Sequence, residues 1–202
     1  TQPFARTLSI RSYSTTKLLK RTTSRRFARL NLSLLLDYRR IVRIDGSPRA
    51  SWGYTYYPVK WRAPYQERRR ALGWSLYGLL GIGRGDVDRM QAQERRNYAF
   101  FDAPVGLLIT IDRDMEQGSW VDVGIFVCQV LIAAEAMGLQ TCPQAALATY
   151  DDVLREVAGL DPGEQIVCGI AIGHADPCDV TARLETPREP VEGFARFLGF
   201  PD

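Results

Sequence analysis

Two stretches of the chain are almost continuously apolar and are bounded by turn residues. Residues 104–111 (PVGLLITI) and 165–173 (QIVCGIAIG) are short and apolar, as is typical of strands buried on both faces. Elsewhere apolar residues recur at helical spacing. This spacing predicts helices over residues 28–42, 65–80, 86–99, 120–137 and 150–159, and a short helix within 186–200. Helices and strands in this order predict an α+β fold.

The expected helix over residues 120–137 contains the longest apolar stretch of the chain. Ser119 is its expected N-cap, and Gly138 is expected to end it. Gln129 and Glu135 interrupt the stretch, which is shorter than the ~20 residues needed to cross hydrocarbon. We therefore expect a helix buried in the protein core and no membrane span.

The segments that flank the helix expected over 65–80 are rich in turn-forming residues. Residues 45–64 are rich in Gly, Pro and aromatic side chains and predict an ordered loop or lid. Leucines at helical spacing predict that one side of the helix over 65–80 faces the core. The GIGRGD stretch at 81–86 lacks a preceding strand, so it predicts a connection between helices, with Asp86 as N-cap of the second.

Composition is that of a globular protein, with one uneven feature in its charge. The 202 residues are 46% apolar and 24% charged, with a net charge of +3. Residues 1–36 contain eight basic side chains and no acid. Residues 1–16 are therefore either a solvated basic tail of a cytoplasmic protein or, with cleavage after Tyr13, a transit peptide for the mitochondrial matrix. Residues 17–202 form one domain, because no repeat or Gly/Ser linker divides them.

Several classes of site have little support in the sequence. The four cysteines show no CxxC or Cys/His spacing, and His174 has no partner nearby, so we expect free thiols and no metal. Cys128 and Cys168 lie in apolar runs and are expected to act as small hydrophobes. The basic residues are not interleaved with aromatic side chains, which argues against nucleic-acid binding. No Ser/His/Asp set or carboxylate pair suggests a hydrolase.

The order of elements after residue 118 is the most distinctive feature of the chain. An apolar helix, a Thr-Cys-Pro-Gln turn at 141–144, an amphipathic helix and an apolar strand follow one another. Near the amino end, residues 21–27 (RTTSRRF) combine guanidinium groups, hydroxyls and amides, which suit a phosphate. This order resembles the C-terminal half of the FMN-dependent nitroreductase family, and residues 21–27 resemble its Arg-x-Ser-x-Arg-x-Phe motif. Residues 56–65, 77–82 and 100–112 resemble one subgroup of that family.

The resemblance implies a nitroreductase-like fold: a mixed, mostly antiparallel sheet flanked by helices, with a long buried central helix. It implies bound FMN, with NADPH or NADH as co-substrate. The reaction would reduce nitroaromatic, quinone or similar small-molecule acceptors by a ping-pong hydride mechanism. It also implies a homodimer, because a flavin site of this kind is shared between subunits. The flavin would carry the chemistry, so no catalytic side chain is expected.

The resemblance also assigns site residues. Residues 21–25 and Arg188 would hold the phosphate and ribityl chain, Pro143 would pack on the flavin ring, and the amides of Gln144 and Ala145 would face N5 and O4. The implied cofactor-binding residues are Arg21, Thr22, Thr23, Arg25, Pro143, Gln144, Ala145 and Arg188. The substrate-side candidates are Tyr77, Phe100, Phe101 and Trp120. For the turn the alternative is a plain connection between helices, for Arg188 a solvated tail residue, and for the aromatic residues core packing.

One segment departs from the family pattern. After the first helix the family has Pro-Ser-x-x-Asn-x-Gln-Pro-Trp, which places an Asn on the partner subunit's flavin. Residues 43–52 read RIDGSPRASW here, without the Asn or Gln-Pro, and about thirty residues, including a core strand, are missing by comparison with the family. The alternative hypothesis is therefore a flavin-free, catalytically impaired homologue that acts as a binding or structural protein.

Overall fold

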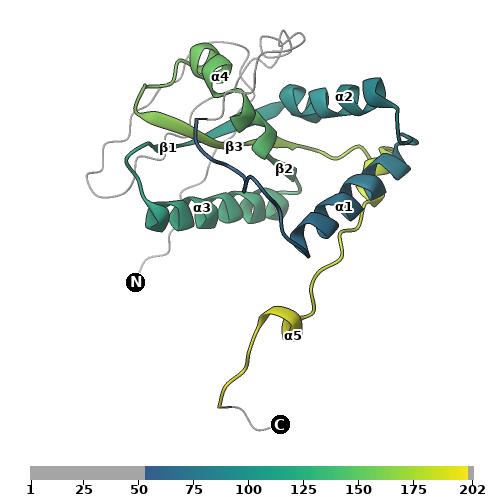
Figure 1. Ribbon diagram of the computed structural model, residues 1–202. Helices are drawn as coiled ribbons and strands as arrows, with labels where there is room; N and C mark the ends of the chain where they lie inside the picture. The colour runs from purple at the N-terminus through teal and green to yellow at the C-terminus, as the bar shows by residue number, and fades with distance from the viewer. Residues whose placement is uncertain (1–52, 200–202) are drawn as a thin grey trace.

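The computed structural model describes residues 53–199 of the chain, which form a three-stranded sheet with helices on both faces (Figure 1). The strand order is β1-β3-β2, and both pairings are antiparallel. The strands are β1 (Val105–Asp112), β2 (Gln140–Gln144) and β3 (Glu164–Gly173). The α-helices are α1 (Tyr65–Leu79), α2 (Val87–Arg95), α3 (Gln117–Ala136), α4 (Asp151–Ala158) and α5 (Val191–Phe194), with 3₁₀ turns η2 (Arg96–Asp102), η3 (Ala145–Thr149) and η4 (Val180–Arg183). The predicted α+β class is confirmed.

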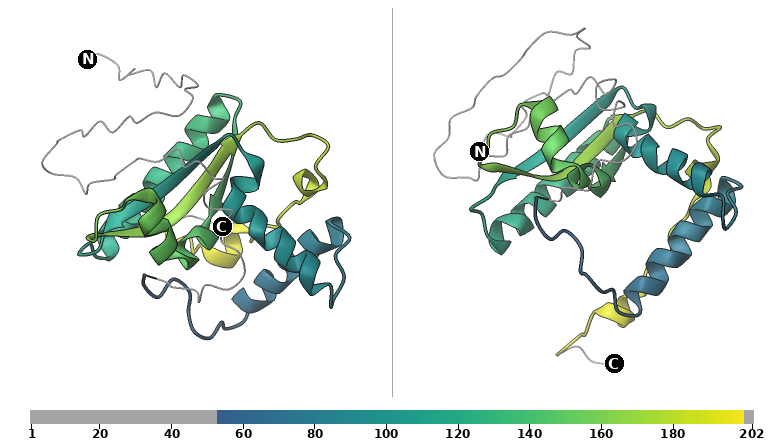
Figure 2. Two further views of the ribbon diagram at one scale, coloured as in Figure 1. Left: turned by 90° about the horizontal axis from the view of Figure 1, so that it is seen from above. Right: turned by 45° about the horizontal axis from the view of Figure 1, so that its top comes forward.

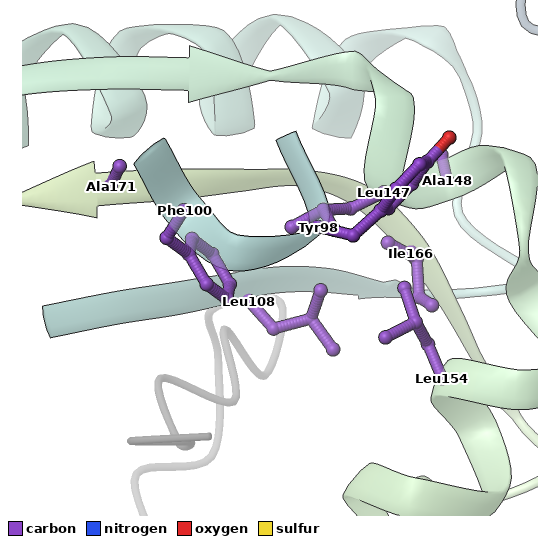
Figure 3. Close-up of a cluster of buried hydrophobic side chains, with 8 residues drawn as sticks. All are labelled: Tyr98, Phe100, Leu108, Leu147, Ala148, Leu154, Ile166 and Ala171. Atoms are coloured by element: carbon purple, nitrogen blue, oxygen red, sulfur yellow. The ribbon is translucent and has the colours of Figure 1, made fainter. Parts of the chain in front are cut away.

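The sheet is covered on its two faces by different elements, as the two views in Figure 2 also show. On one face, α3 packs against a helix-side cluster made of Ile109, Ile111, Val123, Cys168 and Ile170. On the other face, η2, η3 and α4 pack against a turn-side cluster made of Tyr98, Phe100, Leu108, Leu147, Ala148, Leu154, Ile166 and Ala171 (Figure 3). Because neighbouring residues of β1 and β3 pack on opposite faces of the sheet, both strands are almost continuously apolar, as predicted.

The third strand, β2, was not expected from the sequence. Residues 140–144 pair with β3 in the register Gln140 with Gly173 to Gln144 with Gly169, so the predicted turn at 141–144 is wrong. Pro143 is tolerated because, among residues 53–199, β2 is an edge strand, and no second strand there needs the missing N–H of Pro143. A five-residue strand that contains proline carries almost no periodic signal.

The ends of α3 differ in part from the prediction. The helix begins at Gln117 with Glu116 at the N-cap position, so Ser119 lies inside the first turn and does not cap. The Ser119 hydroxyl is instead 3.5 Å from Met115 Sδ. At the other end Gly138 has a φ of +74°, a left-handed conformation that terminates the helix as expected.

The expectation that α3 is a buried central helix holds for only one of its sides. Val123 and Ala134 are its only buried residues in the described chain, and they lie on the side that faces the sheet. On the opposite side Val121, Ile125 and Ile132 are 63%, 53% and 64% exposed. Cys128 is exposed on the same side, whereas Cys168 is buried, so only Cys168 packs in the core as a small hydrophobe. These four residues follow the spacing i, i+4, i+7, i+11, which places them on one outer face of α3.

By length and composition alone, α3 could also cross a membrane. It has 20 residues, and its most apolar 18-residue window has a mean hydropathy of 1.5, with 11% of that window buried. The expected apolar stretch was shorter than the helix observed. However, the sheet-facing side of α3 supplies the packing for β1 and β3, and withdrawing it into lipid would uncover both strands. The packing therefore favours a core helix. Its outer face is left exposed by the described residues.

Helix α1 is present as predicted, but its apolar stripe is not packed on the sheet. Leu72 and Leu79 are 43% and 38% exposed, and none of its residues is buried within the described part of the chain. The predicted core-facing stripe is therefore wrong for a single chain. The C-terminal segment runs beside α1 (Figure 1), where Arg68 and Glu189 form an ion pair of 2.5 Å. Asp86 occupies the N-cap position of α2 as predicted, although its carboxylate accepts from the Gly83 N–H at 2.9 Å.

Candidate functional site

The segment Pro143–Ala145 joins the edge strand β2 to the turn η3. Pro143 is exposed, Gln144 is buried and Ala145 is half-buried. Because β2 is paired only with β3 in the described chain, alternate backbone N–H and C=O groups of the strand point away from the sheet. Residues 140–150 contain no charged side chain. The segment thus offers an apolar surface and backbone dipoles to a flat, uncharged ring.

The Gln144 side chain reaches inward from this segment to η2. It is 2% exposed, and its Nε2 donates to the backbone oxygen of Asn97 at 2.7 Å and lies 3.4 Å from Asn97 Oδ1. The Gln144 Oε1 atom is buried and has no hydrogen-bond partner among the described residues. A buried acceptor without a donor is uncommon in native proteins and often marks a functional position.

The turn at the end of η2 has an unusual backbone. Phe100, Phe101 and Asp102 have φ angles of 51°, 53° and 64°. Each left-handed non-glycine residue costs roughly 1–3 kcal/mol and persists only where the surroundings enforce it. The enforcing contact is the Phe100 ring, which lies against Gly106 and Gly169 on adjacent strands.

Phe100 is a core residue. Its side chain is 1% exposed within the turn-side cluster, so the prediction that Phe100 lines the substrate side is corrected in favour of core packing. A Cβ atom added at Gly106 would lie 2.6 Å from the Phe100 ring, which shows how closely the ring approaches the strand. In the sequence, two adjacent phenylalanines gave no sign of which one faces inward.

Phe101 points to a different environment. The Arg96 guanidinium lies 5.8 Å from its ring centroid. Arg96 also forms ion pairs with Asp102 at 3.7 Å and with Asp179 at 3.8 Å. Phe101 therefore sits at a half-buried, charge-balanced position on the outer side of the turn, and it remains a substrate-side candidate.

The other two aromatic candidates lie on different helices. Tyr77 is on α1, and its ring centroid is 5.9 Å from that of Trp74. Trp120 is on α3, packs against the helix-side cluster and contacts Tyr54 with ring centroids 5.0 Å apart. The contacts described for these two residues do not connect them with each other or with Phe101.

An aromatic ladder that sequence reasoning did not single out orders the segment before α1. Successive ring centroids are 4.8–5.6 Å apart from Trp120 through Tyr54, Tyr56 and Tyr57 to Trp61. The Arg69 guanidinium covers the far end, 4.4 Å from the Trp61 ring. Burial raises the pKa of Tyr56 to about 12 and that of Tyr54 further, so both stay neutral at ordinary pH. The signal was present as four aromatic residues in 54–61, but only the fold shows that their rings contact one another.

The remaining predicted cofactor residues are placed only in part. Arg188 is exposed in the C-terminal segment and donates to the backbone oxygen of Thr186 at 2.9 Å and to the Thr186 hydroxyl. Arg21, Thr22, Thr23 and Arg25 lie outside the described residues, as does the RIDGSPRASW segment. The ring-contact half of the predicted site is thus described, and its neutral exposed edge fits a flavin ring.

The free energy of unfolding is expected to decrease at acid pH because Asp179 becomes protonated. Hydrogen bonds from the Thr181 hydroxyl and backbone N–H hold the pKa of the Asp179 carboxyl below its usual value, and Arg96 adds to the effect. Because the folded pKa is below the unfolded one, the contribution is complete above about pH 4 and is lost as pH falls through the folded pKa. It is worth at most about 1 kcal/mol, because the ion pair with Arg96 is partly exposed.

The variant Asp179→Asn keeps the size and one acceptor but removes the charge. We expect wild type to be more stable than the variant in urea melts at pH 7, and the difference to shrink steadily between about pH 4 and pH 2. A difference that stays constant over this range would contradict the assignment.

Comparison with known proteins agrees with this fold. The family model described as "Nitroreductase family" matches residues 44–174, more than half of the chain. The chain belongs to the nitroreductase family. The predicted nitroreductase-like fold is confirmed by its similarity to the FMN and NADPH-dependent nitroreductase NfnB from sphigopyxis sp. strain HMH. That structure is 31% identical with a TM-score of 0.73, over 81% of this chain and 76% of that one.

Further relatives are similar over most of the chain. The FMN-dependent nitroreductase NfnB from Mycobacterium smegmatis, solved in complex with NADPH, has a TM-score of 0.74 at 27% identity, over 80% of this chain and 72% of that one. A 4-nitrobenzoate reductase from Nocardioides sp. (strain LMS-CY) is 39% identical over 142 residues, which are 70% of this chain and 58% of that protein. A 4-nitrobenzoate reductase from Pseudomonas putida is 38% identical over 136 residues, 67% of this chain and 60% of that protein. The chain thus spans about three fifths of the length of these two curated relatives.

Proposed function

We propose that the protein is an FMN-dependent oxidoreductase that uses NADPH or NADH to reduce an aromatic nitro compound, a quinone or a similar small acceptor. The observation that carries the proposal is the uncharged Pro143–Ala145 segment, with Pro143 exposed, at the sheet edge of a nitroreductase fold. Relatives with this fold are named for dependence on FMN and NADPH or for reduction of 4-nitrobenzoate. When bound, FMN supplies two-electron redox chemistry between the pyridine nucleotide and the acceptor in a ping-pong scheme.

In this proposal the role of the chain is to bind, orient and shield the flavin. Pro143 packs on the flavin ring, and the backbone amides of Gln144 and Ala145 face N5 and O4, where fixed dipoles suit changes of charge on the ring. Residues 21–25 and Arg188 hold the phosphate with guanidinium and hydroxyl donors. Phe101 lies on the acceptor side. No side chain is required as nucleophile or general base.

We also propose that a second copy of the chain covers the outer face of α3 (Val121, Ile125, Cys128 and Ile132). A helix whose inner face is packed and whose outer face is apolar needs a cover to remove that surface from water. A partner subunit would also complete a flavin site of the kind that two subunits share. The curated relatives named above are bacterial, which supports a cytoplasmic protein over the transit-peptide hypothesis.

A flavin-free homologue is the second candidate function. It is favoured by one observation, the absence of the family's Asn and Gln-Pro from residues 43–52. Absorbance decides between the two. A purified protein with the flavin bands expected at about 350–500 nm that bleaches on addition of NADPH supports the oxidoreductase. A protein that stays colourless after incubation with FMN supports the second candidate.

The phosphate-binding residues can be tested separately. We expect Arg21→Ala and Arg25→Ala each to weaken FMN binding about 10- to 100-fold, because each removes charge-assisted hydrogen bonds worth roughly 1.5–3 kcal/mol. Equilibrium dialysis or flavin fluorescence gives the dissociation constants. Arg11→Ala, which removes a cation of the same basic segment outside the motif, serves as the matched control. Equal FMN affinities in all three variants would refute the assignment.

A further inference from the structure

Gln144 has a second feature that its proposed backbone contact with flavin does not use, namely its buried side chain. We infer that this side chain is a positioning residue: it fixes the left-handed turn at residues 100–102 relative to the flavin-facing segment, and thereby sets the acceptor side of the site. The inference rests on the proposed function for the identity of the two sides. The juxtaposition itself, Gln144 Nε2 at 2.7 Å from the Asn97 backbone oxygen, belongs to the fold.

The turn is held at three points, and Gln144 supplies one of them. Tyr98 is buried and packs edge-on against Tyr150, with ring centroids 5.0 Å apart. Phe100 is buried between Gly106 and Gly169. Both anchor η2 through its side chains, whereas Gln144 holds the main chain of η2 directly. Because Gln144 is 2% exposed, water does not compete for this hydrogen bond, which is strengthened in the low-dielectric interior.

The turn needs such a constraint because its backbone is unfavourable. Three successive non-glycine residues with positive φ relax toward ordinary conformations unless the surroundings prevent it. Relaxation would move the outward residue Phe101, together with the Arg96 and Asp102 pair beside it. The contact with Asn97 comes from the same residue whose backbone is proposed to face the flavin. Gln144 therefore connects the flavin-facing segment, through its backbone, with the acceptor side at η2, through its side chain.

The first test does not depend on bound flavin. In Gln144→Met, which keeps length and volume but has no amide, we expect backbone amides of residues 98–103 to exchange with deuterium at least about tenfold faster, while those of the central strand β3 change less than about twofold. Thr110→Val is the matched control. It removes a different buried side-chain hydrogen bond, from Thr110 Oγ1 to Glu164 Oε1 at 3.2 Å, away from the turn. Unchanged exchange at 98–103 in Gln144→Met would overturn the inference.

The second test uses the FMN-loaded protein and compares KM for the acceptor with KM for NADPH. We expect Gln144→Met to raise KM for a nitroaromatic acceptor about tenfold or more, with FMN affinity and KM for NADPH within about twofold of wild type. Thr110→Val should leave all three unchanged. Gln144→Asn, whose amide is one methylene too short, should show the same pattern more mildly, and it replaces Gln144→Met if that variant does not fold.

The outcomes separate this inference from the proposed function. A merely structural role for Gln144 would lower thermal stability to a similar extent in Gln144→Met and Thr110→Val, with no selective change at the turn or in acceptor KM, and this would overturn the inference. A wild-type protein that binds no FMN would refute the proposed function, while the exchange experiment would still decide whether Gln144 fixes the turn.

Discussion

Replacing Ile125 with glutamate is expected to convert a dimeric protein into a monomer that no longer retains FMN. Ile125 lies at the centre of the outer face of α3 and is 53% exposed in a single chain. In a dimer formed through this face, a carboxylate there would be desolvated without a partner, which costs several kcal/mol. We expect the dimer dissociation constant to rise at least about 100-fold, which corresponds to roughly 2.7 kcal/mol.

Light scattering after size-exclusion chromatography gives the oligomeric state, and absorbance gives the flavin content. Gln91→Glu adds the same charge at an exposed position on α2 and should change neither quantity. A dimer that survives Ile125→Glu would show that another surface forms the interface. Partition of the wild-type protein into detergent or vesicles would instead assign the outer face of α3 to lipid.

Gly106→Ala is the second change with a large expected effect. The new Cβ would lie 2.6–2.7 Å from three atoms of the Phe100 ring, and that ring is rigid, buried and attached to a left-handed backbone. Neither the ring nor β1 can move without disturbing the turn-side cluster. We expect the free energy of unfolding to fall by roughly 1–3 kcal/mol or more, the range for overpacked cores.

Urea denaturation measures this change, and two further variants interpret it. Gly78→Ala, in α1 with no atom within 4 Å of the new Cβ, should be neutral or slightly stabilising, because alanine favours helix. Phe100→Leu combined with Gly106→Ala should recover part of the loss, since the smaller side chain relieves the clash. If the double variant loses more free energy of unfolding than Phe100→Leu and Gly106→Ala lose together, the contact between Phe100 and Gly106 is not the cause.

Much of the fold could be predicted from local pattern. Strands β1 and β3 are continuous apolar runs because both of their faces are covered, and α1, α3 and α4 lie within a few residues of their expected positions. Glycine at 138 and at 159 ends a helix in a left-handed conformation, for which a side chain is unfavourable. These signals act over a few residues, so the sequence alone reveals them.

Edge position and burial could not be predicted in this way. Strand β2 exists because its neighbour β3 supplies the hydrogen bonds, and the sequence QTCPQ contains no sign of that pairing. Likewise, Phe100 and Phe101 are adjacent aromatic residues, yet one fills the space left by two glycines and the other faces outward. The choice depends on Gly106, which is on the next strand, and on Gly169, which is distant in the chain.

The sequence by itself determined the family, the α+β class and the position of the Pro143–Ala145 segment, since each depends on the order of residues along the chain. The tertiary structure alone decided that this segment is the edge of a sheet and that the Gln144 side chain holds η2. It also decided that α3 is packed on one face and open on the other. The physical reason is that burial and pairing depend on long-range neighbours, which local spacing does not encode.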